Sequence, residues 1–200
     1  QLAVVATASS ASLASTQSQT ANASISRAVL SLSELVTSNS VLSSNSAVTA
    51  SAVAAQQAVG LAAAAQNTAS AAAADLLVAS TVSIVGVVSD GRTICVAANS
   101  CTKAEIAALS YIAADTAKNA AEASLYVITV TNQLKTLITT EAPTVNVSAA
   151  TAAITTAQTS ATSAQLTANQ TINNYSTSAT AIGFTVTTIS PSTGVTGSVS

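Results

Sequence analysis

The segment that most constrains this chain is residues 102–141, because its start, its apolar repeat and its end can all be recognised. It opens with Thr102, Lys103, Ala104 and Glu105, which match the capping-box pattern S/T-x-x-E. In that box the threonine hydroxyl accepts from the glutamate N–H, and the glutamate carboxylate accepts from the threonine N–H. Pro143 closes the segment, since proline disfavours a helical residue before it and has no N–H to donate. We therefore predict one helix of roughly 60 Å from Thr102 to Glu141.

Apolar and small residues recur along this helix in alternating steps of four and three. The positions are Leu109, Ala113, Thr116, Ala120, Ala123, Val127, Val130, Leu134 and Leu137. A repeat of 3.5 residues keeps one seam turned toward a partner helix. Alanine buries little area, and burial stabilises by only about 25 cal/mol per Å². To be stable, a helix with an alanine seam must be long, must pack against other helices, or both.

Three further segments have helical patterns. Residues 10–42 follow a short start at 1–9 that we expect to fray, and they place Ile25, Val29, Leu32 and Val36 on one face. Clusters of Ser and Asn predict a turn or kink at residues 38–46. Residues 47–88 are alanine-rich, with Gly60 as a candidate close helix crossing, and residues 145–180 are the last helical candidate.

These segments predict an all-α fold: an elongated antiparallel bundle of about four long, Ala-rich helices. Residues 1–182 would form the bundle. Residues 183–200 contain Pro191, Gly194 and Gly197, so we expect an extended tail that is either exchanged with a neighbouring subunit or disordered.

Cys95 and Cys101 are the only two cysteines, and they flank a turn-rich loop that follows Asp90-Gly91. In a secreted protein they would pair into one small ring that staples a central hairpin. Two thiols without any histidine make a poor zinc site, since zinc takes four ligands. We expect a disulfide here, and neither a metal nor another cofactor.

Secretion is an expectation from the first residue and from the sequons. The chain begins at Gln1 and not at Met, which is typical of a mature N-terminus after signal-peptide removal. Four Asn-x-Ser/Thr sequons are candidate N-glycosylation sites: Asn22, Asn146, Asn169 and Asn174. We therefore expect an extracellular or cell-surface glycoprotein.

Charge is scarce in this chain, at 6% of residues, against about a quarter in ordinary soluble domains. Five basic residues and a net charge of −2 argue against nucleic acid as a partner. The most apolar window, residues 76–88, is shorter than the roughly 20 residues of a spanning helix, so no membrane span is expected. Low net charge removes the repulsion that keeps monomers apart. The expected partner is the protein itself.

Catalytic chemistry is not predicted. No histidine is present for a Ser-His-Asp triad, and the acidic residues are scattered. Asp115, Lys118 and Glu122 follow the i,i+3/i+4 spacing of a solvated charge stripe. Tyr111 and Tyr126 lie close to one helix face, either as interface anchors or as plain core residues. We expect no enzyme.

The leading hypothesis is a secreted structural protein that self-associates into a filament, fibre or surface coat, because long Ala-seamed helices bury too little alone. The second is ice binding. Ala-rich, Thr-rich and weakly charged helices resemble the alanine-rich antifreeze proteins of fish, which carry Thr at eleven-residue spacing. Here Thr129 is followed at eleven by Thr140, but Thr116 by Val127, so the resemblance is one of composition. The third is a carrier of an apolar ligand, or an adhesin, built on a helical bundle.

Overall fold

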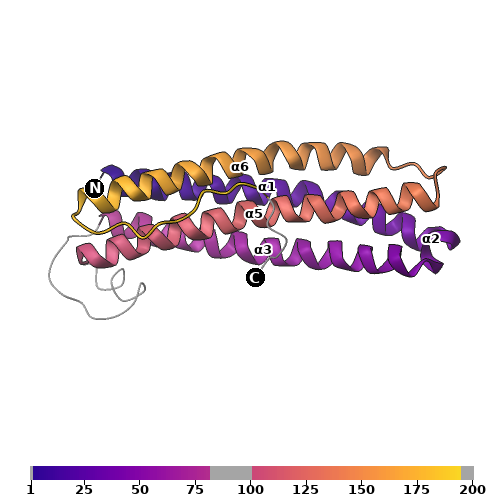
Figure 1. Ribbon diagram of the computed structural model, residues 1–200, viewed down its shortest axis with the longest axis horizontal. Coiled ribbons are helices and arrows are strands. Elements are labelled where there is room, and N and C mark those ends of the chain that lie inside the picture. The colour runs from indigo at the N-terminus through magenta and orange to yellow at the C-terminus, as the bar shows by residue number, and fades with distance from the viewer. Residues whose placement is uncertain (1, 82–100, 195–200) are drawn as a thin grey trace.

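The structure, a computed structural model, describes residues 2–81 and 101–194. Within these residues it contains five helices and no strand: α1 (Leu2–Ser38), α2 (Ser40–Ser44), α3 (Ser46–Thr81), α5 (Lys103–Glu141) and α6 (Ser148–Ala181). The predicted all-α class is confirmed. Figure 1 shows the four long helices side by side in an elongated bundle, in which α1 and α5 run one way and α3 and α6 the other.

The four long helices form a rhombus in cross-section. Both α1 and α5 contact α3, α6 and each other, whereas the described residues of α3 and α6 do not contact one another. Helices α1 and α5 therefore lie at the two ends of the short diagonal, and α3 and α6 occupy the two remaining, opposite corners. A corner helix packs on two neighbours only, so α3 and α6 present wide faces outward.

The turn expected at residues 38–46 is present, and two asparagines cause it. The side-chain oxygen of Asn39 accepts from the N–H of Val41 at 3.0 Å. That of Asn45 accepts from the N–H of Ala47, also at 3.0 Å. Asparagine is among the best helix N-caps, so one helix ends at Ser38, the single turn α2 follows, and α3 begins at Ser46.

The expectation of a frayed start at residues 1–9 is wrong, because α1 is helical from Leu2 onward. Val4 and Ala8 are buried in the same core cluster as Leu76 and Leu109. Tertiary packing of these apolar positions outweighs the low helix propensity of the serines that follow.

Helix α5 has the predicted start and end. The N–H of Glu105 donates to Thr102 Oγ1 at 3.1 Å, and the N–H of Thr102 donates to Glu105 Oε2 at 2.7 Å. The helix ends at Glu141, and Pro143 follows. The seam residues Leu109, Ala113, Ala120, Val127 and Leu134 are each 2% exposed or less. The seam therefore packs against helices of its own chain.

After α6 the chain turns at Gly183, whose φ of +82° suits glycine, and runs back without regular secondary structure. This tail, drawn in yellow in Figure 1, lies on its own bundle: Ile189 is buried with Ala114 of α5 and Ile172 of α6. Its exchange with a neighbouring subunit stays a prediction.

Two predictions about the middle of the chain have different outcomes. Residues 82–100, which include Cys95, the Asp90-Gly91 turn and the predicted helical residues 82–88, lie outside the described residues. The Cys95–Cys101 staple therefore stays a prediction, although Cys101 itself is fully buried beside the α5 cap. The expected close crossing at Gly60 is wrong within this chain, since a Cβ added there would meet nothing within 4 Å.

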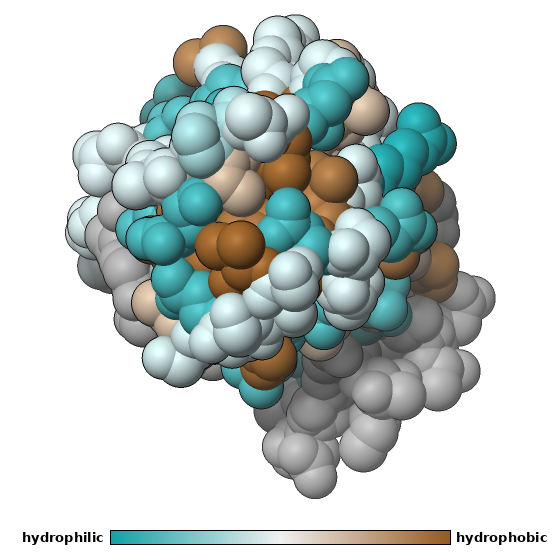
Figure 2. Space-filling model, turned by 90° about the vertical axis from the view of Figure 1, so that its right-hand side faces the viewer, coloured by the Kyte–Doolittle hydropathy of each residue, from teal (hydrophilic) through white to brown (hydrophobic). Residues whose placement is uncertain are grey.

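The hydrophobic core extends to the end of the bundle that carries α2 and the α5–α6 connection. Figure 2 looks onto that end and shows hydrophobic side chains at its centre, with hydrophilic ones around them. Leu42 of α2 is fully buried there, while its neighbour Val41 is 54% exposed. The short helix α2 thus covers the core only in part.

Candidate functional site: the outward faces of α3 and α6

Helix α3 has two apolar rows on opposite sides, each with the 3.5-residue repeat of a packing seam. The inward row is buried and includes Val48, Ala52, Ala55, Ala62, Gln66, Ala69, Ala73 and Leu76. The outward row is exposed and mostly apolar, and it comprises Ala50, Val53, Ala54, Gln57, Gly60, Leu61, Ala64, Asn67, Thr68, Ala71, Ala74, Leu77 and Val78. We call the outward row the α3 outer face. One seam is buried inside the chain, and the second is exposed.

Large aliphatic side chains stand on the α3 outer face. Val53 is 52% exposed, Leu61 and Leu77 are 48% exposed, and Val78 is 45% exposed. A surface helix normally places charged residues on its solvent side. Asp75 is the only charged residue of α3, and it is half-buried at the edge of this face. The face therefore combines exposed apolar area with almost no charge.

Within the described residues, α3 is also the one helix that is long and apolar enough to cross a membrane by length and composition. Only 28% of its most apolar window is buried in the fold. A core helix that passed the same test would be mostly buried. Helix α3 therefore has more apolar residues than it buries within this chain.

The opposite corner of the bundle has a different outward face. Helix α6 contains no charged residue, and its outward side carries exposed threonines, which we call the α6 threonine face: Thr151, Thr155, Thr159, Thr162, Thr177 and Thr180. Several hydroxyls donate to the carbonyl four residues earlier, such as Thr155 to Thr151 at 3.1 Å and Thr159 to Thr155 at 3.2 Å. These bonds restrict χ1, so the methyl groups from Thr151 to Thr162 are held in a row. Exposed Leu166, Gln170 and Asn173 separate this row from Thr177 and Thr180.

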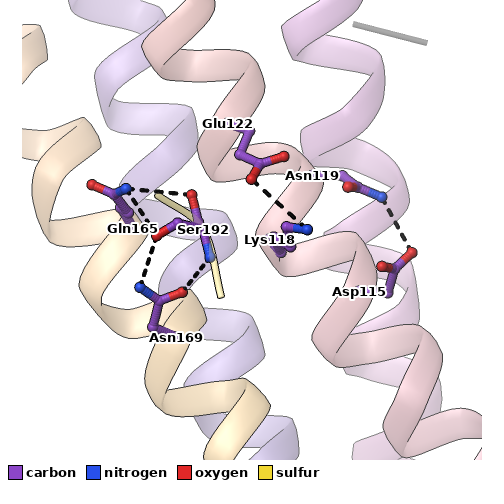
Figure 3. A network of polar contacts seen from close by, with 7 residues as sticks. All are labelled: Asp115, Lys118, Asn119, Glu122, Gln165, Asn169 and Ser192. Atoms are coloured by element: carbon purple, nitrogen blue, oxygen red, sulfur yellow. Dashed lines mark hydrogen bonds and ion pairs between the residues drawn. The ribbon is translucent and has the colours of Figure 1, made fainter. Parts of the chain in front are cut away.

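The charged side chains of α5 form the stripe that their spacing predicts. Lys118 Nζ lies 3.9 Å from Glu122 Oε1, and Asp115 accepts from the Asn119 amide at 3.3 Å (Figure 3). Among the described residues no three His, Cys, Asp or Glu side chains come together as a metal site. The stripe contributes surface charge and brings no pair of carboxylates together.

The four sequons occupy very different environments. Asn22 is buried between helices, and its amide donates to the Val59 carbonyl at 3.3 Å. Asn169 exchanges two hydrogen bonds with the backbone of Ser192 (Figure 3). The Asn174 amide donates to Ala6 and Ser10 of α1. Asn146 alone of the four is exposed, in the α5–α6 connection. The fold thus offers one accessible sequon.

Tyr111 and Tyr126 of α5 have different surroundings in the structure. Tyr126 packs against the main core, partly buried. Tyr111 instead stacks edge-to-face on Tyr175 of α6, with ring centroids 5.8 Å apart. Sequence reasoning singled out Tyr111 but not its partner, because Tyr175 lies in a different helix and nothing in the sequence pairs the two.

Comparison of the chain with known protein families, curated proteins and solved structures finds no match in any of the three. The function is therefore argued from the surface of the molecule. The decisive feature that sequence reasoning missed is the α3 outer face. Its signal was present, since Ala50, Gln57, Ala64, Ala71 and Val78 recur every seven residues beside the buried seam.

Proposed function

We propose that this protein is a structural subunit that self-associates through the α3 outer face and builds a filament, fibre or surface coat. The observation that carries this proposal is the second, exposed 3.5-residue seam of α3, in which four large aliphatic side chains are about half exposed. No enzymatic role and no cofactor is part of the proposal.

A second copy of the same face is the partner that fits best. Its apolar rows would bury the exposed valines and leucines of α3, and Asp75 at its edge is the only charge of that helix. Gly60 and the exposed alanines let two helix axes approach closely, since they project almost nothing. With a net charge of −2, two copies repel each other only weakly.

Growth beyond a dimer needs a second contact on each subunit. Helix α6 lies at the corner opposite α3, so contacts through both corners would extend an assembly in one direction. A contact of the α3 outer face with its own copy closes into a dimer. A second contact at the opposite corner then joins dimers into an open chain. The α6 threonine face is the surface available at that corner, and an exchanged tail is the alternative route.

We further propose that the protein is extracellular. In this proposal a Cys95–Cys101 disulfide forms before α5, and Asn146 carries a glycan. Support comes from the burial of Cys101 beside the Thr102 cap and from the exposure of Asn146. A ring at this point would tether the connection between α3 and α5, and disulfides persist in oxidising compartments.

The test is light scattering over a concentration series, with negative-stain electron microscopy of the same samples. We compare the wild type with Leu61→Lys, which puts a charge in the middle of the α3 outer face. Gln133→Lys, at an exposed position of α5, is the matched control. We expect the wild type and Gln133→Lys to associate and Leu61→Lys to remain monomeric. A wild-type monomer at high concentration, or a Leu61→Lys variant that associates normally, would overturn the proposal.

A second candidate function is ice binding, and the α6 threonine face favours it. Thr151 and Thr162 are eleven residues apart on that face, as are Thr156 and Thr167 along α6, a spacing of about 16 Å on a helix. This candidate is tested by thermal hysteresis and ice recrystallisation of the wild type and of Thr159→Lys. We expect activity that Thr159→Lys abolishes and Leu61→Lys retains. Hysteresis no greater than that of an inert protein would exclude it.

A further inference from the structure

A pocket of about 330 Å³ lies where the C-terminal tail crosses α5 and α6. Its lining includes Tyr111, Tyr175 and Phe184. The whole chain has only four aromatic residues, three Tyr and one Phe. Three of the four therefore gather at one concave site, while the rest of the bundle is packed with Ala, Val, Leu and Ile. Tyr111 and Tyr175 also pack in the small core cluster under the tail, but Phe184 is 38% exposed and belongs to no buried cluster.

The pocket has an apolar floor and an aromatic side. Ala107, Ala108 and Ile112 of α5 form the floor. The Tyr111 and Tyr175 rings meet at 76°. Because Tyr175 is only 3% exposed, Tyr111 and Phe184 provide most of the aromatic surface that a ligand can reach. Aromatic partners favour offset or edge-to-face contact with such rings.

The third wall is the tail segment that contains Phe184, Thr185 and Thr187, and it is held in place. The Tyr175 hydroxyl donates to the Thr187 carbonyl at 3.2 Å and accepts from the Thr187 N–H at 3.0 Å. Further along the tail, the N–H of Ser192 donates to Asn169 at 2.8 Å, and its carbonyl accepts from Asn169 and Gln165 (Figure 3). The pocket is therefore formed before any ligand arrives.

No charged side chain lines the pocket. The hydroxyls of Tyr111, Thr185 and Thr187 are its side-chain polar groups that have no hydrogen bond to another described residue. A charged ligand would lose hydration without gaining a partner. An uncharged ligand with one hydrogen-bonding group would lose little hydration free energy.

We propose that this pocket binds a neutral small molecule with a flat, apolar ring system and one hydrogen-bonding group. Ligand pockets commonly span about 300–1,000 Å³ and combine apolar walls with a few polar groups. The volume here is near the lower limit, which fits a molecule of two or three rings better than a sterol or an acyl lipid. This site is independent of the α3 outer face.

The probe is the neutral dye N-phenyl-1-naphthylamine, whose emission rises in apolar sites, titrated into the full chain. We expect saturable binding that weakens about tenfold in Tyr111→Ala and in Phe184→Ala, as the loss of one ring contact implies. Phe184 is 38% exposed, so its variant should fold, and circular dichroism checks this. The chain has no Trp, so energy transfer from tyrosine to bound dye reports proximity directly.

A second cavity provides the matched control. It has about 280 Å³, is lined by Ser26, Val29, Leu30, Gln56 and Val59, and contains no aromatic residue. Leu30→Ala should leave binding unchanged, and so should Leu61→Lys, which removes any subunit interface. The proposal is overturned if the dye does not bind saturably, if Leu30→Ala weakens it as much as Phe184→Ala, or if the anionic analogue 8-anilinonaphthalene-1-sulfonate binds as tightly.

Discussion

The side-chain amide of Gln66 in α3 donates a hydrogen bond to the hydroxyl of Ser124 in α5, with 3.1 Å between the two atoms. The same nitrogen donates to the Ser18 carbonyl of α1 at 3.0 Å, and the backbone carbonyl of Gln66 accepts from the Ser15 hydroxyl at 3.1 Å. One buried glutamine thus joins three helices. Alanine seams slide past one another with little change in packing, so this polar layer defines the register of the bundle, as a buried Asn does in coiled coils.

We predict that Gln66→Ala lowers the free energy of unfolding by about 1–3 kcal/mol, because it removes two buried hydrogen bonds between helices, each of which contributes about 0.5–1.5 kcal/mol. Urea unfolding followed by circular dichroism at low protein concentration measures the change. Gln133→Ala, at an exposed site of α5, should stay within about 0.5 kcal/mol of the wild type. Equal stability of the two variants would show that the polar layer does not stabilise the bundle.

The capping box gives a second prediction. Removing the Thr102 hydroxyl leaves the Glu105 N–H without its acceptor, so Thr102→Ala should cost about 0.5–2 kcal/mol of unfolding free energy. Thr136→Ala removes a hydroxyl from an exposed site within the same helix and should cost nothing, since alanine is the better helix former. Identical unfolding midpoints for the two variants would contradict the role of the cap.

Two glycines with open space at the position of a Cβ allow the effect of backbone conformation on stability to be measured apart from the effect of side-chain packing. A Cβ would meet nothing within 4 Å at either Gly60 or Gly183, but only Gly183 has a positive φ, of +82°. Gly60→Ala should therefore stabilise the monomer by about 0.5–1 kcal/mol, and Gly183→Ala should destabilise it by about 1–2 kcal/mol. Thermal unfolding of the two variants side by side measures both, and changes of the same sign would refute the assignment.

The parts of the fold that were predictable from sequence are those determined by local chemistry. Thr102 and Glu105 cap their own helix, Pro143 ends it, and the asparagines at 39 and 45 bond to their own backbone neighbours. Each of these signals acts within four residues. The apolar repeat of α5 was also predictable, because the spacing of a seam is set by the sequence of one helix.

What was not predictable depends on contacts between distant segments. Val4 packs in a cluster with residues more than seventy positions away. The serines that follow Val4 in the sequence therefore led to the wrong prediction of a frayed start. The Tyr175–Thr187 bond and the aromatic pocket arise only when the tail folds back on α6. Whether a 3.5-residue row on α3 faces the core or solvent depends on where α1 and α5 lie, and Gly60 was misassigned for that reason.

A disulfide between Cys95 and Cys101 predicts a specific labelling pattern. In the unfolded, unreduced protein neither thiol should react with an alkylating reagent, and both should react after reduction. Loss of the small ring should lower the free energy of unfolding by about 2 kcal/mol in the chain-entropy description. Intact-mass measurement before and after reduction gives the answer, and alkylation without reductant would exclude the bond.

Glycosylation in a eukaryotic secretory system should be confined to Asn146 in the folded product. The amides of Asn22, Asn169 and Asn174 are used in hydrogen bonds to Val59, to Ser192 and to α1. A glycan on any of them would remove that bond, and at Asn22 it would also have to occupy a buried site, so such chains should misfold and be retained. Glycopeptide mass spectrometry of the secreted fraction should find sugar at Asn146 alone, and Asn146→Gln should abolish it. Sugar at Asn22 in folded, secreted protein would contradict the helix packing described above.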